Sequence, residues 1–294
     1  MSKVFPSVII GYYLGQRLPE NLRPVLRSAR TLDEVIATVT VSKLFENLSG
    51  SKDLLEAERR ARESYYNILE ELRSVTFGES RKIVELILDR HAIKRTRALI
   101  GAIERNIPPE DRKLCMAIGF LKPEALRVGS IEELREYIPE KYHKPTMYEL
   151  LLAYREEALK ASLSPKVKRM LERELSLRTL LLIIRSRINK DISQEVEKIA
   201  EVDPYATPTL VRRVAEAKDR KSVLDELAEH PFYEYIKDID DPFEAFFQLH
   251  DKAPEIIGFK NVPVIPSPER IYSGLKLLER EVEKLVSIMN MVVV

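Results

Sequence analysis

Apolar residues recur every three or four positions along most of the chain, which is the spacing of one face of an α-helix. The longest such stripe consists of Ile271, Leu275, Leu278, Val282, Leu285 and Met289. Shorter stripes predict further helices over residues 51–75, 79–105 and 164–189. Strand-forming residues do not cluster anywhere, so the pattern predicts an all-α protein.

Prolines and capping residues mark the expected starts of several helices. Four prolines stand where a short helix would begin: Pro19, Pro123, Pro208 and Pro242. Asp241 is expected to cap the helix that starts at Pro242 and runs to about Leu249. Ser267 is expected to cap the last long helix, and residues 253–266 are expected to form an irregular loop.

Three sets of sequence features recur in the same order, which indicates an internal repeat. The first feature is a proline followed by a short apolar segment, beginning at Pro19, Pro123 and Pro208. The second is an apolar–acid–Glu–apolar segment, found at residues 32–35, 131–134 and 224–227. Each set ends in a long helix. We therefore predict three helical repeats with boundaries 1–107, 108–200 and 201–294.

The chain is rich in charge, yet its 48 basic and 47 acidic residues nearly cancel. Dense, balanced charge is typical of ion-pair networks on thermophilic proteins, so we expect a thermophilic source. The three predicted repeats carry net charges of +4, +3 and −6. This asymmetry is compatible with a different partner at each end, or with a chance distribution of surface charge.

The sequence offers no recognisable catalytic, metal-binding or cofactor-binding motif. The four histidines show no metal-ligand spacing, and no glycine-rich phosphate loop is present. Cys115 lies in an apolar run, so we expect a core residue rather than a nucleophile. With no apolar run of about 20 residues and no signal-peptide pattern, we expect a cytoplasmic protein without a membrane span.

Two groups of basic residues are the candidates for binding a partner. They are Arg90, Lys94 and Arg97 on the first long predicted helix, and Arg178, Arg185 and Arg187 on the second. The alternative is an ordinary solvated helix surface. Nucleic acid is not expected as a partner, because aromatic residues do not alternate with these basic residues and the isoelectric point is near neutral, about 7.7.

Several of these segments also resemble the repeats of one protein family. Gly119-Phe120-Leu121 and the segment from Asp89 to Lys94, followed by Arg97, resemble two of its motifs, although Ala92 stands where the family has asparagine. Residues 179–185 occupy the matching place in the second repeat, and residues 279–282 resemble the closing helix. The family is that of the C subunits of archaeal A-type ATP synthases, which are similar to the d subunits of V-type ATPases.

The resemblance implies a fold and a mechanical role. The fold would be three pseudo-repeated helical domains arranged as a funnel around a central cavity. The protein would be a non-catalytic central-stalk connector that seats the D and F shaft subunits on the membrane proteolipid ring, in ion-coupled (for example hydrogen-ion) ATP synthesis or hydrolysis. It would be held at the membrane through the complex. A helical-repeat adaptor unrelated to ATPases is the alternative.

Overall fold

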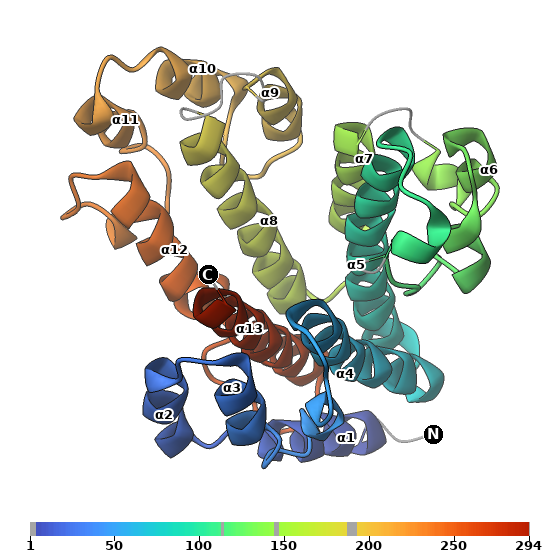
Figure 1. Cartoon of the computed structure of the whole chain (residues 1–294). Helices are drawn as coiled ribbons and strands as arrows, with labels where there is room; N and C mark the ends of the chain where they lie inside the picture. The colour runs from blue at the N-terminus through green and yellow to red at the C-terminus, as the bar shows by residue number, and fades with distance from the viewer. Residues whose placement is uncertain (1–3, 113–114, 144–146, 187–192, 294) are drawn as a thin grey trace. The chain divides into compact units, whose positions relative to one another are not determined.

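The structure is a computed structural model that describes residues 4–112, 115–143, 147–186 and 193–293 (Figure 1). These residues form α-helices and short 3-10 helices, and the described part contains no β-strand. One isolated bridge joins Ile118 to Leu121. The predicted all-α class is confirmed. The chain divides into two compact units: Met1–His143 together with Val262–Val294, and Lys144–Asn261.

Unit 1 contains the two ends of the chain. Its α-helices are α1 (Val4–Gly15), α2 (Arg23–Ser28), α3 (Leu32–Val39), α4 (Leu54–Val75), α5 (Gly78–Glu104), α6 (Ile131–Arg135) and α13 (Pro268–Val293). Its 3-10 helices are η1 (Glu20–Leu22), η2 (Glu46–Leu48), η3 (Pro109–Asp111), η4 (Pro123–Arg127) and η5 (Glu140–Tyr142). Pro123 therefore opens a 3-10 helix, and Pro19 directly precedes one.

Helix α13 is the centre of unit 1, where it packs against α1, α3, α4 and α5 (Figure 1). Every residue of the predicted stripe from Ile271 to Met289 is buried. Ser267 accepts a hydrogen bond from the backbone N–H of Arg270, which confirms the predicted cap. The helix also buries Lys276 and Glu279, so its buried surface is wider than the apolar stripe alone.

Helices α1 and α13 approach each other closely at a glycine. A Cβ atom on Gly274 would lie 2.3 Å from Cγ2 of Ile10, whose side chain is fully buried. Any larger residue at position 274 would therefore force the two helices apart or displace Ile10.

Unit 2 contains the remaining helices. They are α7 (Met147–Lys160), α8 (Pro165–Ser186), α9 (Ser193–Glu201), α10 (Pro208–Glu216), α11 (Arg220–Glu226), α12 (Pro242–Ile257) and the 3-10 helix η7 (Tyr233–Tyr235). Helix α8 packs against α7, α9, α10 and α12, and it buries residues on all sides. The apolar stripe predicted for this helix is Leu177, Leu181, Ile184 and Ile188. Leu177 and Ile184 are buried, Leu181 is half-buried, and Ile188 lies outside the described residues.

The apolar–acid–Glu–apolar segments of the first two sets prove to be helix starts. The Thr31 side chain accepts the backbone N–H of Glu34, and Glu34 accepts the backbone N–H of Arg30, the residue before the cap, which gives a variant of the capping box. Ser130 and Glu133 form the same arrangement at the start of α6. In the third set, residues 224–227 lie at the end of α11 instead, and Asp219 caps that helix.

The prediction that residues 253–266 form a loop is wrong over its first part. Helix α12 starts at Pro242 with the predicted Asp241 cap, but it continues through Pro254 to Ile257. Ile256 and Ile257 are buried, and Gly258 adopts a left-handed conformation that ends the helix. The carbonyl of Pro254 accepts the N–H groups of residues 258, 259 and 260, which stabilises the last turn despite the proline.

Candidate functional site

Arg90, one of the predicted partner-binding residues, lies inside unit 1. Its exposed fraction is 4%, and its guanidinium Nη2 donates to the Glu279 carboxylate at 2.6 Å. Arg90 on α5 therefore does not share an exposed face with Lys94, as the i, i+4 spacing suggested. The reason is that its counter-charge lies on α13, which the local sequence does not show.

Glu279 is the centre of a buried ionic cluster between α5 and α13. We define the Glu279 cluster as Arg90, His91, Lys276 and Glu279, each at most 5% exposed. Lys276 Nζ donates to Glu279 at 2.6 Å, and His91 Nε2 lies 3.3 Å from the other carboxylate oxygen. The rings of Tyr65 and Tyr66 on α4 contact the His91 ring edge-on, so α4 also packs against the cluster between α5 and α13.

The charges in this cluster follow from its burial and its composition. Burial alone would raise the pKa of Glu279, but the adjacent Arg90 and Lys276 charges hold it well below its usual value. Burial lowers the pKa of His91 to about 3, so the imidazole is neutral at pH 7. The Arg90 and Lys276 cations therefore share the Glu279 carboxylate. A substitution that removes this carboxylate would leave both cations without their counter-charge.

The other predicted residues on α5 lie nearer to solvent. Lys94 is exposed, and its ammonium group lies 3.8 Å from the carboxylate of Glu283 on α13. Arg97 is half-buried. Both side chains remain at the surface of unit 1, where a partner could reach them.

The predicted residues on α8 lie at the surface of unit 2. Arg178 is half-buried and donates to Glu174, one helical turn earlier, at 2.9 Å. Arg185 is exposed near the end of the helix, and Arg187 lies outside the described residues. The two groups of basic residues thus belong to different compact units.

Unit 2 has its own buried ionic centre, around Asp203 in the connection after α9. The Asp203 side chain is fully buried and accepts hydrogen bonds from Arg155, Ser176 and Thr179. It also accepts the backbone N–H groups of residues 205 and 206 at 2.9 Å. Because these donors come from α7, α8 and the chain after α9, one carboxylate joins three segments.

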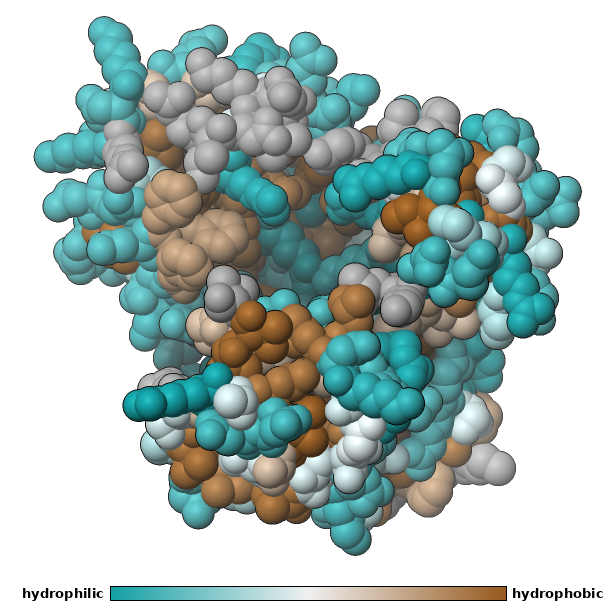
Figure 2. Space-filling view, viewed as in Figure 1, coloured by the Kyte–Doolittle hydropathy of each residue, from teal (hydrophilic) through white to brown (hydrophobic). Residues whose placement is uncertain are grey.

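An apolar groove of about 100 Å³ lies beside the second half of α13 in unit 1. Its apolar lining consists of Leu18, Leu26, Val39, Phe45, Leu285 and Ile288. Glu281 and Lys284 complete the lining, with one charge of each sign. Figure 2 shows brown, apolar surface gathered around the end of α13.

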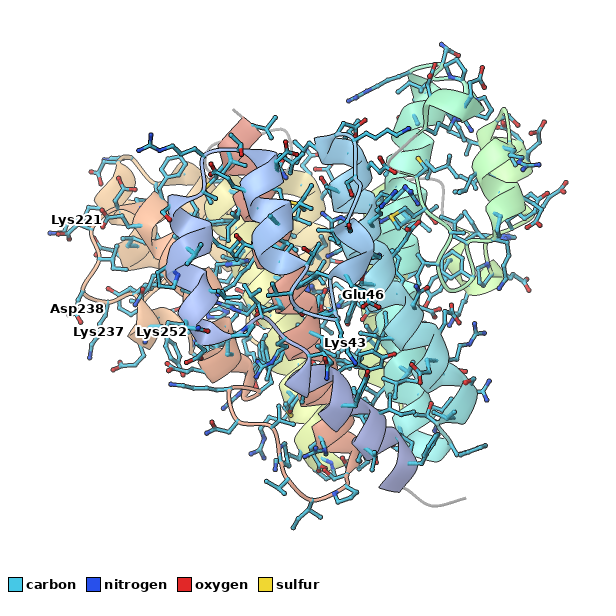
Figure 3. All side chains as sticks on the ribbon, turned by 60° about the horizontal axis from the view of Figure 1, so that its bottom comes forward. Lys43, Glu46, Lys221, Lys237, Asp238 and Lys252 are labelled. Atoms are coloured by element: carbon cyan, nitrogen blue, oxygen red, sulfur yellow. The ribbon has the colours of Figure 1, made fainter. Side chains whose placement is uncertain are left out.

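A larger and more polar groove of about 300 Å³ lies between α1, α4 and the connection between α3 and α4. We call it the polar groove; its residues are Tyr12, Tyr13, Gln16, Lys43, Leu44, Glu46, Asn47, Ser64, Asn67 and Ile68. Figure 3 shows Lys43 and Glu46 on the connection that precedes α4. The lining offers hydroxyl, amide, cationic and anionic groups but no catalytic combination of them.

Other candidate chemistry is sparse in the part of the chain that the structure describes. No group of three or more histidine, cysteine, aspartate or glutamate side chains is arranged to hold a metal ion within the described ranges. Cys115 is half-buried rather than fully buried, and burial raises the pKa of its thiol, which disfavours a nucleophilic thiolate. Among the described helices, none combines the length and the apolar character that crossing a bilayer requires.

The described part of the chain is thus all-α, with a buried ionic centre in each compact unit and two grooves on unit 1. The comparisons with known proteins specify the class. The family model described as ATP synthase (C/AC39) subunit matches residues 15–293. The chain belongs to this family, as the sequence resemblance indicated. A comparison with curated proteins gave no match.

Proposed function

We propose that the protein is the central-stalk connector of an A/V-type rotary ATPase. In this role it seats the D and F shaft subunits on the membrane proteolipid ring, so that ion flow and ATP chemistry share one rotating part. The observation that carries the proposal is the family match over residues 15–293, which covers nearly the whole chain. The match favours this role over an adaptor unrelated to ATPases.

The order of helices supports the further proposal of three diverged repeats with boundaries 1–107, 108–200 and 201–294. Apart from α2, which follows η1 in the first set only, the first and second sets continue after η1 and η4 with a short capped helix, a 3-10 helix, a longer helix and a closing long helix. These are α3, η2, α4 and α5 in the first set and α6, η5, α7 and α8 in the second. The third set has α11, η7, α12 and α13 in this order, after the α-helix α10 in place of the 3-10 helix.

The packing of the closing helices also suits a connector that transmits torque. Helix α5 contacts elements of the second set, since Asp89 accepts hydrogen bonds from Lys141 and from the buried Tyr142. Helix α8 packs against α10 and α12 of the third set, and α13 packs against α3 and α4 of the first. Each closing helix thus contacts elements of a set other than its own within its compact unit.

A connector needs binding faces rather than an active site, so we propose that the protein is non-catalytic and needs no cofactor. Lys94, Arg97, Arg178 and Arg185 are the basic side chains that we propose for contact with an acidic partner surface. The protein would be peripheral to the membrane, held there by the ring. The funnel around a central cavity stays a prediction.

Co-purification from native membranes tests the connector role. A tagged chain should be recovered in one complex with the D and F subunits and with the proteolipid, identified by mass spectrometry after gentle detergent extraction. Reproducible recovery of the chain without shaft or ring proteins would refute the connector role.

A further inference from the structure

The outer face of α12 in unit 2 carries two aromatic side chains in solvent (Figure 1). Phe243 and Phe247 are 48% and 65% exposed, and they are the large apolar side chains exposed within the described residues of unit 2. They lie one helical turn apart, so their rings fall in one stripe. The helix buries Ala245 and Leu249 instead, and it packs against α8 and α11. Two phenylalanines therefore lie outside while an alanine lies inside, an arrangement that folding alone does not favour.

The chain around these two rings is strongly acidic. Residues 234–251 contain six acidic residues, one lysine and no arginine, a net charge of −5, whereas the rest of the chain carries +6. Lys237 pairs with Glu234 at 2.8 Å, so the one cation of this segment is already neutralised. Asp240 and Glu244 are exposed, and neither forms a hydrogen bond or an ion pair within the described part of the chain. The aromatic stripe therefore lies beside carboxylates that can pair with a partner.

Each exposed ring has one of these carboxylates three positions before it in the sequence. Glu244 precedes Phe247 by three positions on α12, which places its side chain beside the ring. Asp240 precedes Phe243 by three positions, just before the start of the helix. An arginine guanidinium can stack on an aromatic ring and pair with a nearby carboxylate, whereas a lysine ammonium is a compact, strongly hydrated charge. The pairing of rings with carboxylates therefore fits arginine better than lysine.

We define the α12 face as Asp240, Phe243, Glu244 and Phe247. We propose that the α12 face binds an apolar segment of a partner protein that carries arginine. The arginine side chains would stack on the rings and pair with the carboxylates, and apolar side chains of the segment would cover the rest of the stripe. This inference goes beyond the connector function, because the contacts proposed above for unit 2, Arg178 and Arg185, require a partner surface of the opposite charge.

The same acidity disfavours two other classes of occupant. Anionic lipid headgroups attract helices with Lys and Arg on their polar face, and the net charge of −5 over residues 234–251 repels them. Nucleic acid is repelled for the same reason, since its affinity comes largely from basic side chains at phosphates. The α12 face is therefore suited to a basic protein segment.

The test measures binding of the full-length chain to a short fluorescent peptide composed of arginine and leucine, by fluorescence anisotropy. A second peptide has lysine in place of every arginine. Phe247→Ala removes one ring, and Glu244→Gln removes one carboxylate. Phe77→Ala is the matched control, because Phe77 is 54% exposed but lies in unit 1. Circular dichroism establishes that each variant is folded.

Wild type and Phe77→Ala should bind the arginine peptide equally. Phe247→Ala and Glu244→Gln should each bind it about two- to fivefold more weakly, and wild type should bind the lysine peptide more weakly by a similar factor. Absence of binding by wild type, equal binding by Phe247→Ala and wild type, or equal binding of the two peptides would overturn this inference. These outcomes leave the connector function intact, because the assay contains neither shaft nor ring.

Two further measurements establish what covers the α12 face. Phe247→Ala should still be recovered from native membranes together with the D and F subunits. Loss of these subunits would assign the α12 face to the shaft and overturn the inference of a separate basic partner. A dimer of the chain that Phe247→Ala dissociates would also overturn it, since a second copy would then be the occupant.

Discussion

Replacing Glu279 with glutamine should destabilise the protein strongly, although the two side chains have nearly the same shape. Glu279 accepts hydrogen bonds from Arg90 and Lys276, each at 2.6 Å, and all three side chains are at most 5% exposed. Glutamine would leave two buried cations next to a neutral amide. Removing one partner of a buried ion pair costs about 3–5 kcal/mol, and we expect a loss in this range.

Lys276→Met is the matched control in the same cluster. It removes one of the two cations, keeps the apolar part of the side chain and leaves the Arg90–Glu279 pair in place. Because the cluster then holds one charge of each sign, we expect a change in unfolding free energy of no more than about 1 kcal/mol. Comparing the unfolding free energies of the two variants separates the effect of losing the carboxylate charge from the effect of disturbing the packing.

Urea denaturation followed by circular dichroism at the helix band measures both effects, since the chain contains no tryptophan for fluorescence. With a slope of about 3 kcal/mol per molar urea, Glu279→Gln should lower the midpoint by roughly 1–1.7 M. A shift below about 0.3 M, or an equal shift for Lys276→Met, would refute the description of Glu279 as the carboxylate that holds two buried cations together.

Three further predictions concern pH, the centre of unit 2 and the glycines. Burial lowers the pKa of His91 to about 3 and that of His230 to about 4, so both histidines bind protons more readily in the unfolded chain. Their contribution to the free energy of unfolding should be fully present above pH 6.5 and fall below it, by about 1.4 kcal/mol per histidine between pH 7.5 and 5.5. Thermal midpoints that do not change over this pH range would contradict the prediction. Asp203→Asn should cost about 3–5 kcal/mol and lower hydrogen-exchange protection first in α8, whereas unchanged protection there would argue against a shared ionic centre. Gly274→Ala should cost about 1–3 kcal/mol because its Cβ would overlap Ile10. Gly101→Ala, which places a Cβ in open space on α5, should stabilise the protein by about 0.5–1 kcal/mol. Equal melting temperatures for the two variants would refute the close-packing argument.

The helices were predictable where one apolar face decides the structure. The stripe from Ile271 to Met289 and the Ser267 cap identified α13, and both features depend only on nearby residues. The end of α12 was missed because Pro254 normally stops a helix. Here the buried residues Ile256 and Ile257 and the left-handed Gly258 stabilise one more turn beyond the proline.

The candidate site was less predictable, because its main contacts join distant parts of the chain. The spacing of Arg90 and Lys94 indicated one basic face, yet Arg90 is paired with a residue 189 positions later. Glu279 was recognisable in the sequence only as part of the closing-helix resemblance. One sequence feature did indicate that Arg90 is buried. Polar and apolar residues do not separate onto two sides of α5, since Arg90 and His91 are followed directly by Ala92 and Ile93.

The two compact units also could not be derived from the predicted repeats. Helix α13 closes the third set, but it packs against α1, α3 and α4 of the first. Sequence repetition indicates which segments are alike and does not determine which of them pack together. Gly274 and Ile10 illustrate this, since their close contact joins the last helix of the chain to the first.

Adding the purified chain back to membranes that have been stripped of it tests the connector function most directly. The quantity to measure is the amount of the D and F shaft subunits that sediments with the membranes, with and without the chain. The proposal predicts that the shaft subunits return to the membranes only when the chain is present, in a stoichiometric ratio to it. Equal return of the shaft subunits to membranes without the chain would contradict the proposed connector function.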